Sequence, residues 1–328
     1  MAFRIGTTRD LLTASGKPAF NEAAFEELQG NPDIEWEWIP EDVSEITPDI
    51  AARYDGLHVN LPRVTAASVA RDDCRVKIIA RNGVGFDTVD VAACAAKGIT
   101  VTNTPFAIRR PVAVAALTLI FALSGKLFTK DRIVREGRWN DRVEHMGIGL
   151  TGRRLGLIGA GGIGRELIPL ARPFFREVQV YDPYIDAGLL TGLGAVKCSF
   201  EELVSEADFV VVACPLNNET HHLMNAAAFE QMKPTACFIN VARGPIHDEA
   251  ALCAALTSGQ IAAAGLDVTE VEPIAPDSPL LGMTNTIVTP HALCWTDECF
   301  EDIARTALRS IVEVSLGRNP AHPVAAGQ

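Results

Sequence analysis

The sequence predicts an α/β protein with two parallel β-sheets, and three observations favour this class. Short runs rich in β-branched and apolar residues alternate with helical stretches along the whole chain, which is typical of βα units around parallel sheets. The 328 residues are too many for one ordinary core and suit two domains. A second series of alternating segments begins near Arg154, where an apolar run leads into a glycine-rich loop.

The first series predicts a small domain with a parallel, flavodoxin-like sheet. Its expected strands are 4–7, 35–39, 56–59, 76–80 and 100–102. The segments between them, including 21–29 and 65–72, are expected to be helical. Strands joined through helices pair in parallel, so this part of the chain should form βα units.

The second series predicts a larger sheet. Six strands are expected, at 155–158, 178–181, 209–213, 237–241, 263–268 and 286–289. Each is short and almost entirely apolar, which is typical of strands buried on both faces. Six such strands with intervening helices fit a doubly wound, Rossmann-type sheet.

Domain boundaries are expected where the two series meet. We expect one domain to comprise 1–103 with 291–328, and the other to comprise 104–290. A crossing helix is expected within 105–127, because Pro105 and Pro111 mark its start and Gly125 its end. This segment is apolar on all sides, so we expect it to pack between domains or against another subunit.

Composition narrows the classes of partner. A net charge of −12 disfavours nucleic acid and anionic membranes as partners. The N-terminus has no apolar signal region, and the longest apolar run, 112–123, is too short to span a bilayer. The eight cysteines are scattered without metal-ligand spacing. They predict reduced thiols in the cytoplasm and no metal site.

The strongest local motif predicts a nucleotide site between the strand at 155–158 and a helical stretch. It consists of Gly159, Gly161, Gly162, Ile163 and Gly164. In such loops the glycines permit a tight turn, close backbone approach to a diphosphate and close helix–strand packing. Asp182 ends the next strand, where a carboxylate accepts ribose hydroxyls and repels a 2′-phosphate. The motif favours NAD over NADP; the alternative is a glycine-rich turn followed by an Asp-Pro turn.

Three reactive side chains follow strands of the second series, at the edge where ligands bind in open α/β sheets. They are Arg243, Glu272 and His291. Histidine can take the hydroxyl proton when a secondary alcohol is oxidised, a carboxylate can hold its ring, and arginine can bind a carboxylate. Each residue also has an alternative interpretation without a catalytic role. Arg243 could be a surface cation at a strand end, Glu272 a solvated surface acid like its neighbour Glu270, and His291 a core histidine.

Several segments together resemble the D-isomer-specific 2-hydroxyacid dehydrogenases, including glyoxylate/hydroxypyruvate reductases and phosphoglycerate dehydrogenases. The similarity covers nearly the whole chain. The segments are 82–87, 103–105, 137–139, 159–164, 240–244, 265–268 with Glu272-Pro273, and 289–291.

The resemblance implies a role for each of these parts. His291 would be the acid/base, Glu272 its partner, and Arg243 the ligand of the substrate carboxylate and carbonyl. The backbone amides of Val84 and Gly85 would hold the same carboxylate. The remaining implied cofactor contacts are Cys214, Pro215, Thr220, Val241 and Asp267, the last beside the nicotinamide carboxamide. The family also implies a substrate domain, an NAD domain, a cleft between them and a homodimer.

The chain departs from the family pattern near the expected cleft. Val114 stands where many relatives carry an acidic residue, and 292–295 replaces a glycine-rich stretch. Arg109 and Arg110 oppose a helix dipole. They suggest either a second anionic group on the substrate or a solvated basic pair. Trp139 and Trp295 suggest either pocket walls or core packing.

Two other functions stay open on the sequence. One is a phosphite or other non-keto-acid dehydrogenase of the same fold; formate enzymes carry an amide where this chain has Glu272. The other is an NAD(H)-sensing binding protein, which the short tail of this chain disfavours. The principal prediction is interconversion of a D-2-hydroxy acid and its 2-keto acid with NAD.

Overall fold

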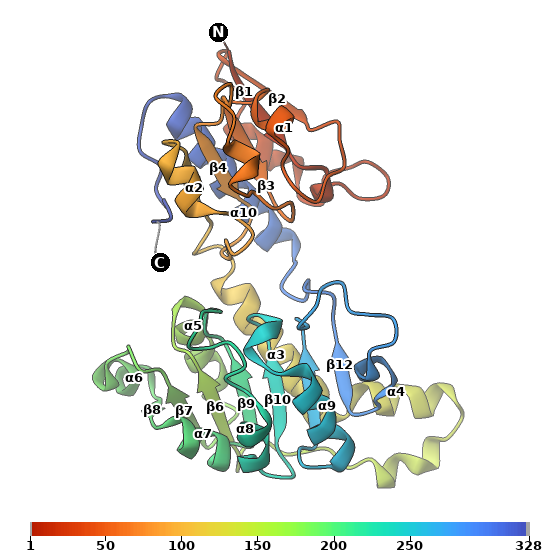
Figure 1. Ribbon diagram of the computed structural model, residues 1–328. Helices are drawn as coiled ribbons and strands as arrows, with labels where there is room; N and C mark the ends of the chain where they lie inside the picture. The colour runs from red at the N-terminus through yellow and green to blue at the C-terminus, as the bar shows by residue number, and fades with distance from the viewer. Residues whose placement is uncertain (1, 326–328) are drawn as a thin grey trace. The chain divides into compact units, whose positions relative to one another are not determined.

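The computed structural model describes residues 2–325, and the chain divides into two compact units (Figure 1). Unit 2 is Arg109–Cys294, and unit 1 combines the chain before it with the chain from Trp295 onward. The boundaries expected from the sequence, 103/104 and 290/291, lie slightly upstream of these divisions. The final part of the expected first domain, 326–328, lies outside the described residues.

Unit 1 contains a parallel five-stranded sheet with the order β2-β1-β3-β4-β5, so the predicted sheet type is confirmed. Its strands are β1 (Phe3–Thr7), β2 (Ile34–Trp38), β3 (Gly56–Val59), β4 (Ile78–Arg81) and β5 (Thr100–Thr102). Its α-helices are α1 (Pro48–Ala51), α2 (Val91–Ala96) and α10 (Asp297–Ser315). The C-terminal α10 packs on one face with Ile5 and Ile78. Leu57 and Val101 belong to a second core with residues of α1 and α2.

Two segments of unit 1 that were expected to be helical form only short 3-10 turns. They are η2 (Glu22–Glu27) and η3 (Ala67–Val69); a third such turn, η1 (Arg9–Leu11), follows β1. Asn21 caps η2 through its side chain, and Gly30 follows it with φ of +97°. The turns span six and three residues, and short 3-10 pieces of this kind are frequent as connectors between other elements.

Unit 2 contains a parallel seven-stranded sheet with the order β12-β11-β10-β9-β6-β7-β8. Its strands are β6 (Arg154–Ile158), β7 (Glu177–Tyr181), β8 (Val196–Lys197), β9 (Phe209–Val212), β10 (Cys237–Asn240), β11 (Ala263–Leu266) and β12 (Thr286–Val288). The doubly wound sheet is confirmed, but the expected number of six strands was wrong. The missed strand, β8, has only two residues, both exposed at the edge of the sheet. No apolar run in the sequence therefore indicates it.

Helices cover both faces of this sheet. They are α3 (Arg109–Gly125), α4 (Leu127–Arg135), α5 (Gly162–Ala171), α6 (Ala187–Leu193), α7 (Phe200–Glu206), α8 (Ala226–Gln231) and α9 (Glu249–Ser258), with the 3-10 turns η4 (Trp139–Glu144), η5 (Gly244–Ile246) and η6 (Pro279–Gly282). Side chains of α7, α8 and α9 form a core with Val210 and Phe238. In Figure 1, α3 passes behind the strands while α8 and α9 lie in front. Helix α3 packs against α5, β10 and β11.

The expected crossing helix corresponds to α3, which begins at Arg109, inside the expected range 105–127, and ends at Gly125 as the sequence indicated. Lys126 then adopts a left-handed conformation and α4 follows. Most apolar side chains of α3 are buried, but Val114 and Phe121 stay exposed, so the chain covers this helix incompletely. No single helix among the described residues is long and apolar enough to cross a membrane. Only the pair α3 and α4, bent by 54°, passes that test of length and composition.

Candidate active site

The glycine-rich loop between β6 and α5 has the shape of a dinucleotide turn. Gly159 has φ of +93°, and a Cβ atom there would lie 2.7 Å from the backbone of Cys214. A Cβ atom on Gly164 would lie 2.4 Å from the carbonyl oxygen of Gly159. Close approach therefore requires glycine at both positions.

The start of α5 fits an anionic group. Gly161 caps this helix without a side chain, and no described atom lies within 4 Å of a Cβ built there. Gly162 and Ile163 form the first turn, whose N–H groups carry the positive end of the helix dipole. The loop therefore fits the diphosphate of a dinucleotide.

Asp182 lies directly after β7, beside the glycine loop. Its carboxylate accepts the N–H of Ala160 at 2.8 Å and the N–H of Tyr184 at 2.9 Å. Because Ala160 belongs to the loop, the structure brings the loop and the carboxylate together. A carboxylate at this point favours ribose hydroxyls over a 2′-phosphate.

The expected adenosine-side residues follow β9, which pairs with β6. The hydroxyl of Thr220 donates to the carbonyl of Pro215 at 2.7 Å, which fixes the turn between them. Burial raises the pKa of the Cys214 thiol to about 12, so this thiol is protonated at neutral pH and acts as a packing group. Val241 is buried directly after the neighbouring β10.

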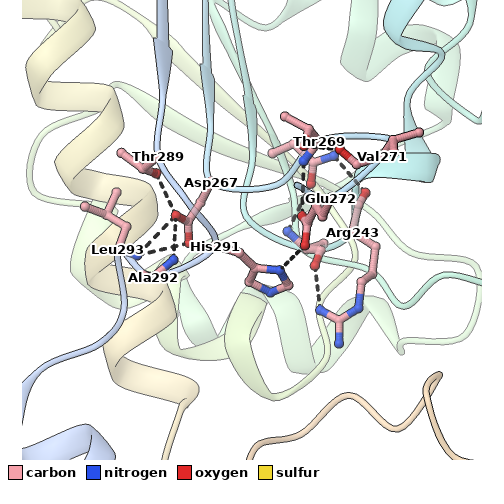
Figure 2. Close-up of polar contacts among 11 residues, drawn as sticks. Arg243, Asp267, Thr269, Val271, Glu272, Thr289, His291, Ala292 and Leu293 are labelled. Atoms are coloured by element: carbon pink, nitrogen blue, oxygen red, sulfur yellow. Dashed lines mark hydrogen bonds and ion pairs between the residues drawn. The ribbon is translucent and has the colours of Figure 1, made fainter. Parts of the chain in front are cut away.

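A histidine–carboxylate pair lies beyond the carboxyl ends of β11 and β12 (Figure 2). Nδ1 of His291 lies 2.8 Å from Oε2 of Glu272, and Oε1 of Glu272 accepts the N–H of Thr269 at 3.2 Å. Since an ionised carboxylate can only accept, the contact places a proton on Nδ1 and leaves Nε2 as the acceptor. The side chains of His291 and Glu272 are 41% and 40% exposed, so a small molecule can reach them.

The charge state of Glu272 follows from its surroundings. Burial disfavours its ionised form, but the hydrogen bond and charge of His291, the Thr269 N–H and the charge of Arg243 outweigh it. The pKa of Glu272 is therefore lowered. An ionised carboxylate here holds the imidazole in one orientation and stabilises positive charge that develops on it.

Arg243 is held close to this pair by an unusually tight contact between loops. A Cβ atom on Gly244 would lie 1.8 Å from the carbonyl oxygen of Thr269, so the loop after β10 packs directly on the loop after β11. The Arg243 guanidinium donates to the carbonyl of Ala242 at 2.7 Å, and Asn240 donates to the Arg243 carbonyl at 2.9 Å. Figure 2 shows Arg243, Glu272 and His291 on neighbouring loops. The structure thus brings these three side chains together.

Asp267 supports the histidine loop. This buried carboxylate accepts the hydroxyl of Thr289 at 2.6 Å and the N–H groups of Ala292 and Leu293, both at 3.1 Å (Figure 2). His291 lies inside this loop with φ of +54°. These contacts of Asp267 therefore position the loop, and its expected contact with a nicotinamide carboxamide stays a prediction.

Glu270, the acidic neighbour of Glu272, has a different place. Its carboxylate lies 2.8 Å from Nε2 of His222 and accepts the N–H of Glu249 at 2.9 Å. The Glu270 N–H donates in turn to the Glu249 carboxylate at 3.1 Å. This reciprocal pairing ties the loop after β11 to the start of α9, and only Glu272 faces His291.

Val84 and Gly85 belong to unit 1 and follow β4. The Asn103 amide donates to the Val84 carbonyl at 2.8 Å, and the Thr104 N–H donates to the carbonyl of Gly83 at 2.9 Å. Gly83 has φ of +133°, so a glycine suits this turn. The two expected carboxylate-binding residues therefore lie in a turn that neighbouring backbone and side chains define.

These features coincide with a family match. The family model described as "D-isomer specific 2-hydroxyacid dehydrogenase, NAD binding domain" matches residues 117–292. The chain belongs to this family. NAD is accordingly its cofactor, and the matched residues contain the glycine loop, Asp182, Arg243, Glu272 and His291.

Similarity to individual proteins supports the same family assignment. The D-3-phosphoglycerate dehydrogenase of Archaeoglobus fulgidus is 36% identical over 81% of this chain, and the alignment spans only half, 50%, of that relative's length. The glyoxylate reductase of Korarchaeum cryptofilum is 36% identical over 75% of each protein. The crystal structure of a glyoxylate reductase from Paecilomyes thermophila has a TM-score of 0.84 at 26% identity and covers 99% of both chains.

Sequence reasoning missed two residues that hold Glu272 and Arg243 in place. Thr269 acts through its backbone N–H on Glu272, and Gly244 acts through the absence of a side chain. A glycine directly after Arg243 was the only available signal, because a backbone donor can belong to any residue type except proline.

Proposed function

We propose that this chain interconverts a D-2-hydroxy acid and its 2-keto acid with NAD. The observation that supports this most is the Glu272–His291 pair, beside Arg243, at the carboxyl edge of the sheet that carries the glycine loop. In this proposal unit 2 is the NAD-binding domain and unit 1 the substrate domain. Val84 and Gly85 of unit 1 contribute backbone N–H groups to the substrate carboxylate.

Each of the three side chains has a distinct role in the proposed reaction. Bound NAD supplies the hydride acceptor. His291 takes the hydroxyl proton at Nε2, and Glu272 at Nδ1 keeps the ring oriented and offsets its positive charge. Arg243 binds the substrate carboxylate and polarises the developing carbonyl through its planar fork. In the reverse direction His291 returns the proton to the carbonyl oxygen.

The first test follows NADH absorbance with a panel of 2-keto acids that includes glyoxylate and hydroxypyruvate, with NADPH in parallel. We expect NADH oxidation with at least one acid, and the ranking to define the substrate. H291N should lower kcat by roughly 10²–10⁴-fold, the usual contribution of a general acid/base, while the Kd for NADH stays unchanged. E272Q should also lower kcat. Wild-type activity in H291N would contradict the proposed proton transfer.

The remaining alternatives have distinct outcomes in the same assay. Turnover with phosphite and with no keto acid would assign the chain to phosphite oxidation. Tight NADH binding without turnover of any acid would favour an NAD(H)-sensing protein. A preference for NADPH would contradict the interpretation of Asp182.

Two further parts of the proposal concern the surroundings of the enzyme. We propose a homodimer, supported by exposed apolar side chains on α4 and η4 that include Phe128 and Trp139. We also propose a cytoplasmic location, supported by eight free cysteines. Arg243, Glu272 and His291 suit many 2-keto acids, so the panel of acids defines the specific substrate.

A further inference from the structure

Arg109, the first residue of α3, lies against the cofactor loop. A Cβ atom on Gly162 would lie 2.6 Å from Nε of Arg109 and 3.1 Å from its Cδ and Cζ atoms. Gly162 is the first residue of α5. The guanidinium group therefore occupies the space that a side chain at the start of α5 would fill.

Several sources of positive potential meet at this point. α3 begins at Arg109 and packs against α5, which begins at Gly162. Each helix has the positive end of its dipole at its first turn, and Arg109 adds a full charge. A cation at a helix N-terminus opposes the dipole, so an anion beside the arginine would offset this cost. The chain as a whole has a net charge of −12, so the positive charge at this point contrasts with the charge of the protein as a whole.

The adjacent Arg110 has a different environment. Its Nη1 atom lies 2.7 Å from Oε1 of Glu166 on α5, and its side chain is 66% exposed. Arg110 thus pairs with Glu166 of α5, and Arg109 lies at the glycine loop. Arg110 serves as a matched control, because it is an adjacent cation on the same helix turn.

We propose that Arg109 binds the diphosphate of the dinucleotide at the glycine loop. The inference rests on the proposed function, because it requires NAD to bind at this loop. A guanidinium group can donate two N–H groups to phosphate oxygens. Glycine at position 162 leaves room for the guanidinium beside the loop. Arg109 is thereby assigned to the cofactor, and not to a second anionic group on the substrate.

The test measures the Kd of NADH and of ADP-ribose without substrate, by fluorescence and by calorimetry. R109A removes charge-assisted hydrogen bonds to the diphosphate, so it should weaken both ligands roughly 10–100-fold. Adenosine, which lacks the diphosphate, should bind R109A and wild type equally. R110A should stay within about twofold of wild type. G162A leaves the charge but displaces the guanidinium, and should weaken NADH as well.

The outcomes separate this inference from the proposed function. If wild type binds NADH and R109A binds it equally well, the inference is overturned and the proposed function stands. If R109A spares NADH but raises KM only for keto acids with a second anionic group, the arginine belongs to the substrate and the inference again fails. If wild type binds no NADH, both proposals fall. Circular dichroism and the Tm of each variant check that it is folded.

Discussion

At the scale of single residues, a buried histidine links the stability of unit 2 to pH. His247 is fully buried, Asn240 donates to its Nδ1 at 3.0 Å, and its Nε2 has no partner among the described residues. Burial lowers the pKa of His247 to about 4. The unfolded ring titrates near 6.5, so its contribution to stability is fully present above that pH. It is lost as pH falls through about 4.

H247Q should therefore reduce the acid sensitivity of the protein. Between about pH 6.5 and 4, each such histidine steepens the fall of the unfolding free energy by up to about 1.4 kcal/mol per pH unit. Urea unfolding at several pH values measures this slope. H221Q, at an exposed histidine nearby, should leave the slope unchanged. Equal slopes in wild type and H247Q would contradict the assignment.

The residues of the site differ in how far the sequence predicts them. Arg243 and His291 stand at the ends of apolar runs, and the carboxyl edge of a parallel sheet collects such side chains. Position after a strand does not separate Glu272 from Glu270, because both follow the same strand, and only the resemblance of Glu272-Pro273 to the family singled out Glu272. Their roles depend on which partner each carboxylate faces, His291 or His222, and that depends on how the loops fold.

At the scale of elements, the end of β11 holds the end of β12 through Asp267. The carboxylate accepts from two backbone N–H groups and from Thr289. D267N replaces one acceptor with a donor that faces other donors, so we expect the unfolding free energy to fall by about 1.5–3 kcal/mol. T289V removes only the hydroxyl contacts and should cost about 1 kcal/mol. Hydrogen exchange at Ala292 and Leu293 should accelerate in D267N, and unchanged exchange there would argue against this support.

Elements were predictable where burial sets their composition. The strands β3 and β5 have the expected bounds, and most strands of unit 2 were displaced by only one or two residues at an end. β8 was missed because an exposed, two-residue edge strand needs no apolar side chains. The helical character of the segment that contains η2 was overestimated. Its composition suits a helix, but capping by Asn21 and the turn at Gly30 shorten it.

At the scale of the whole molecule, the exposed apolar side chains between α4 and the end of the following loop predict a second copy as partner. They are Leu127, Phe128, Val134, Trp139, Val143 and Met146, each more than half exposed. Together these side chains expose apolar area to water, which is unfavourable unless a partner covers it. We expect a dimer by light scattering at micromolar concentration. F128D with W139D should shift the dimer toward monomer, because charges in a buried interface are costly.

L316D, at an exposed leucine of unit 1, should leave the dimer intact. A wild-type monomer would show that another ligand or segment covers this surface, and loss of the dimer in L316D alone would move the interface to unit 1.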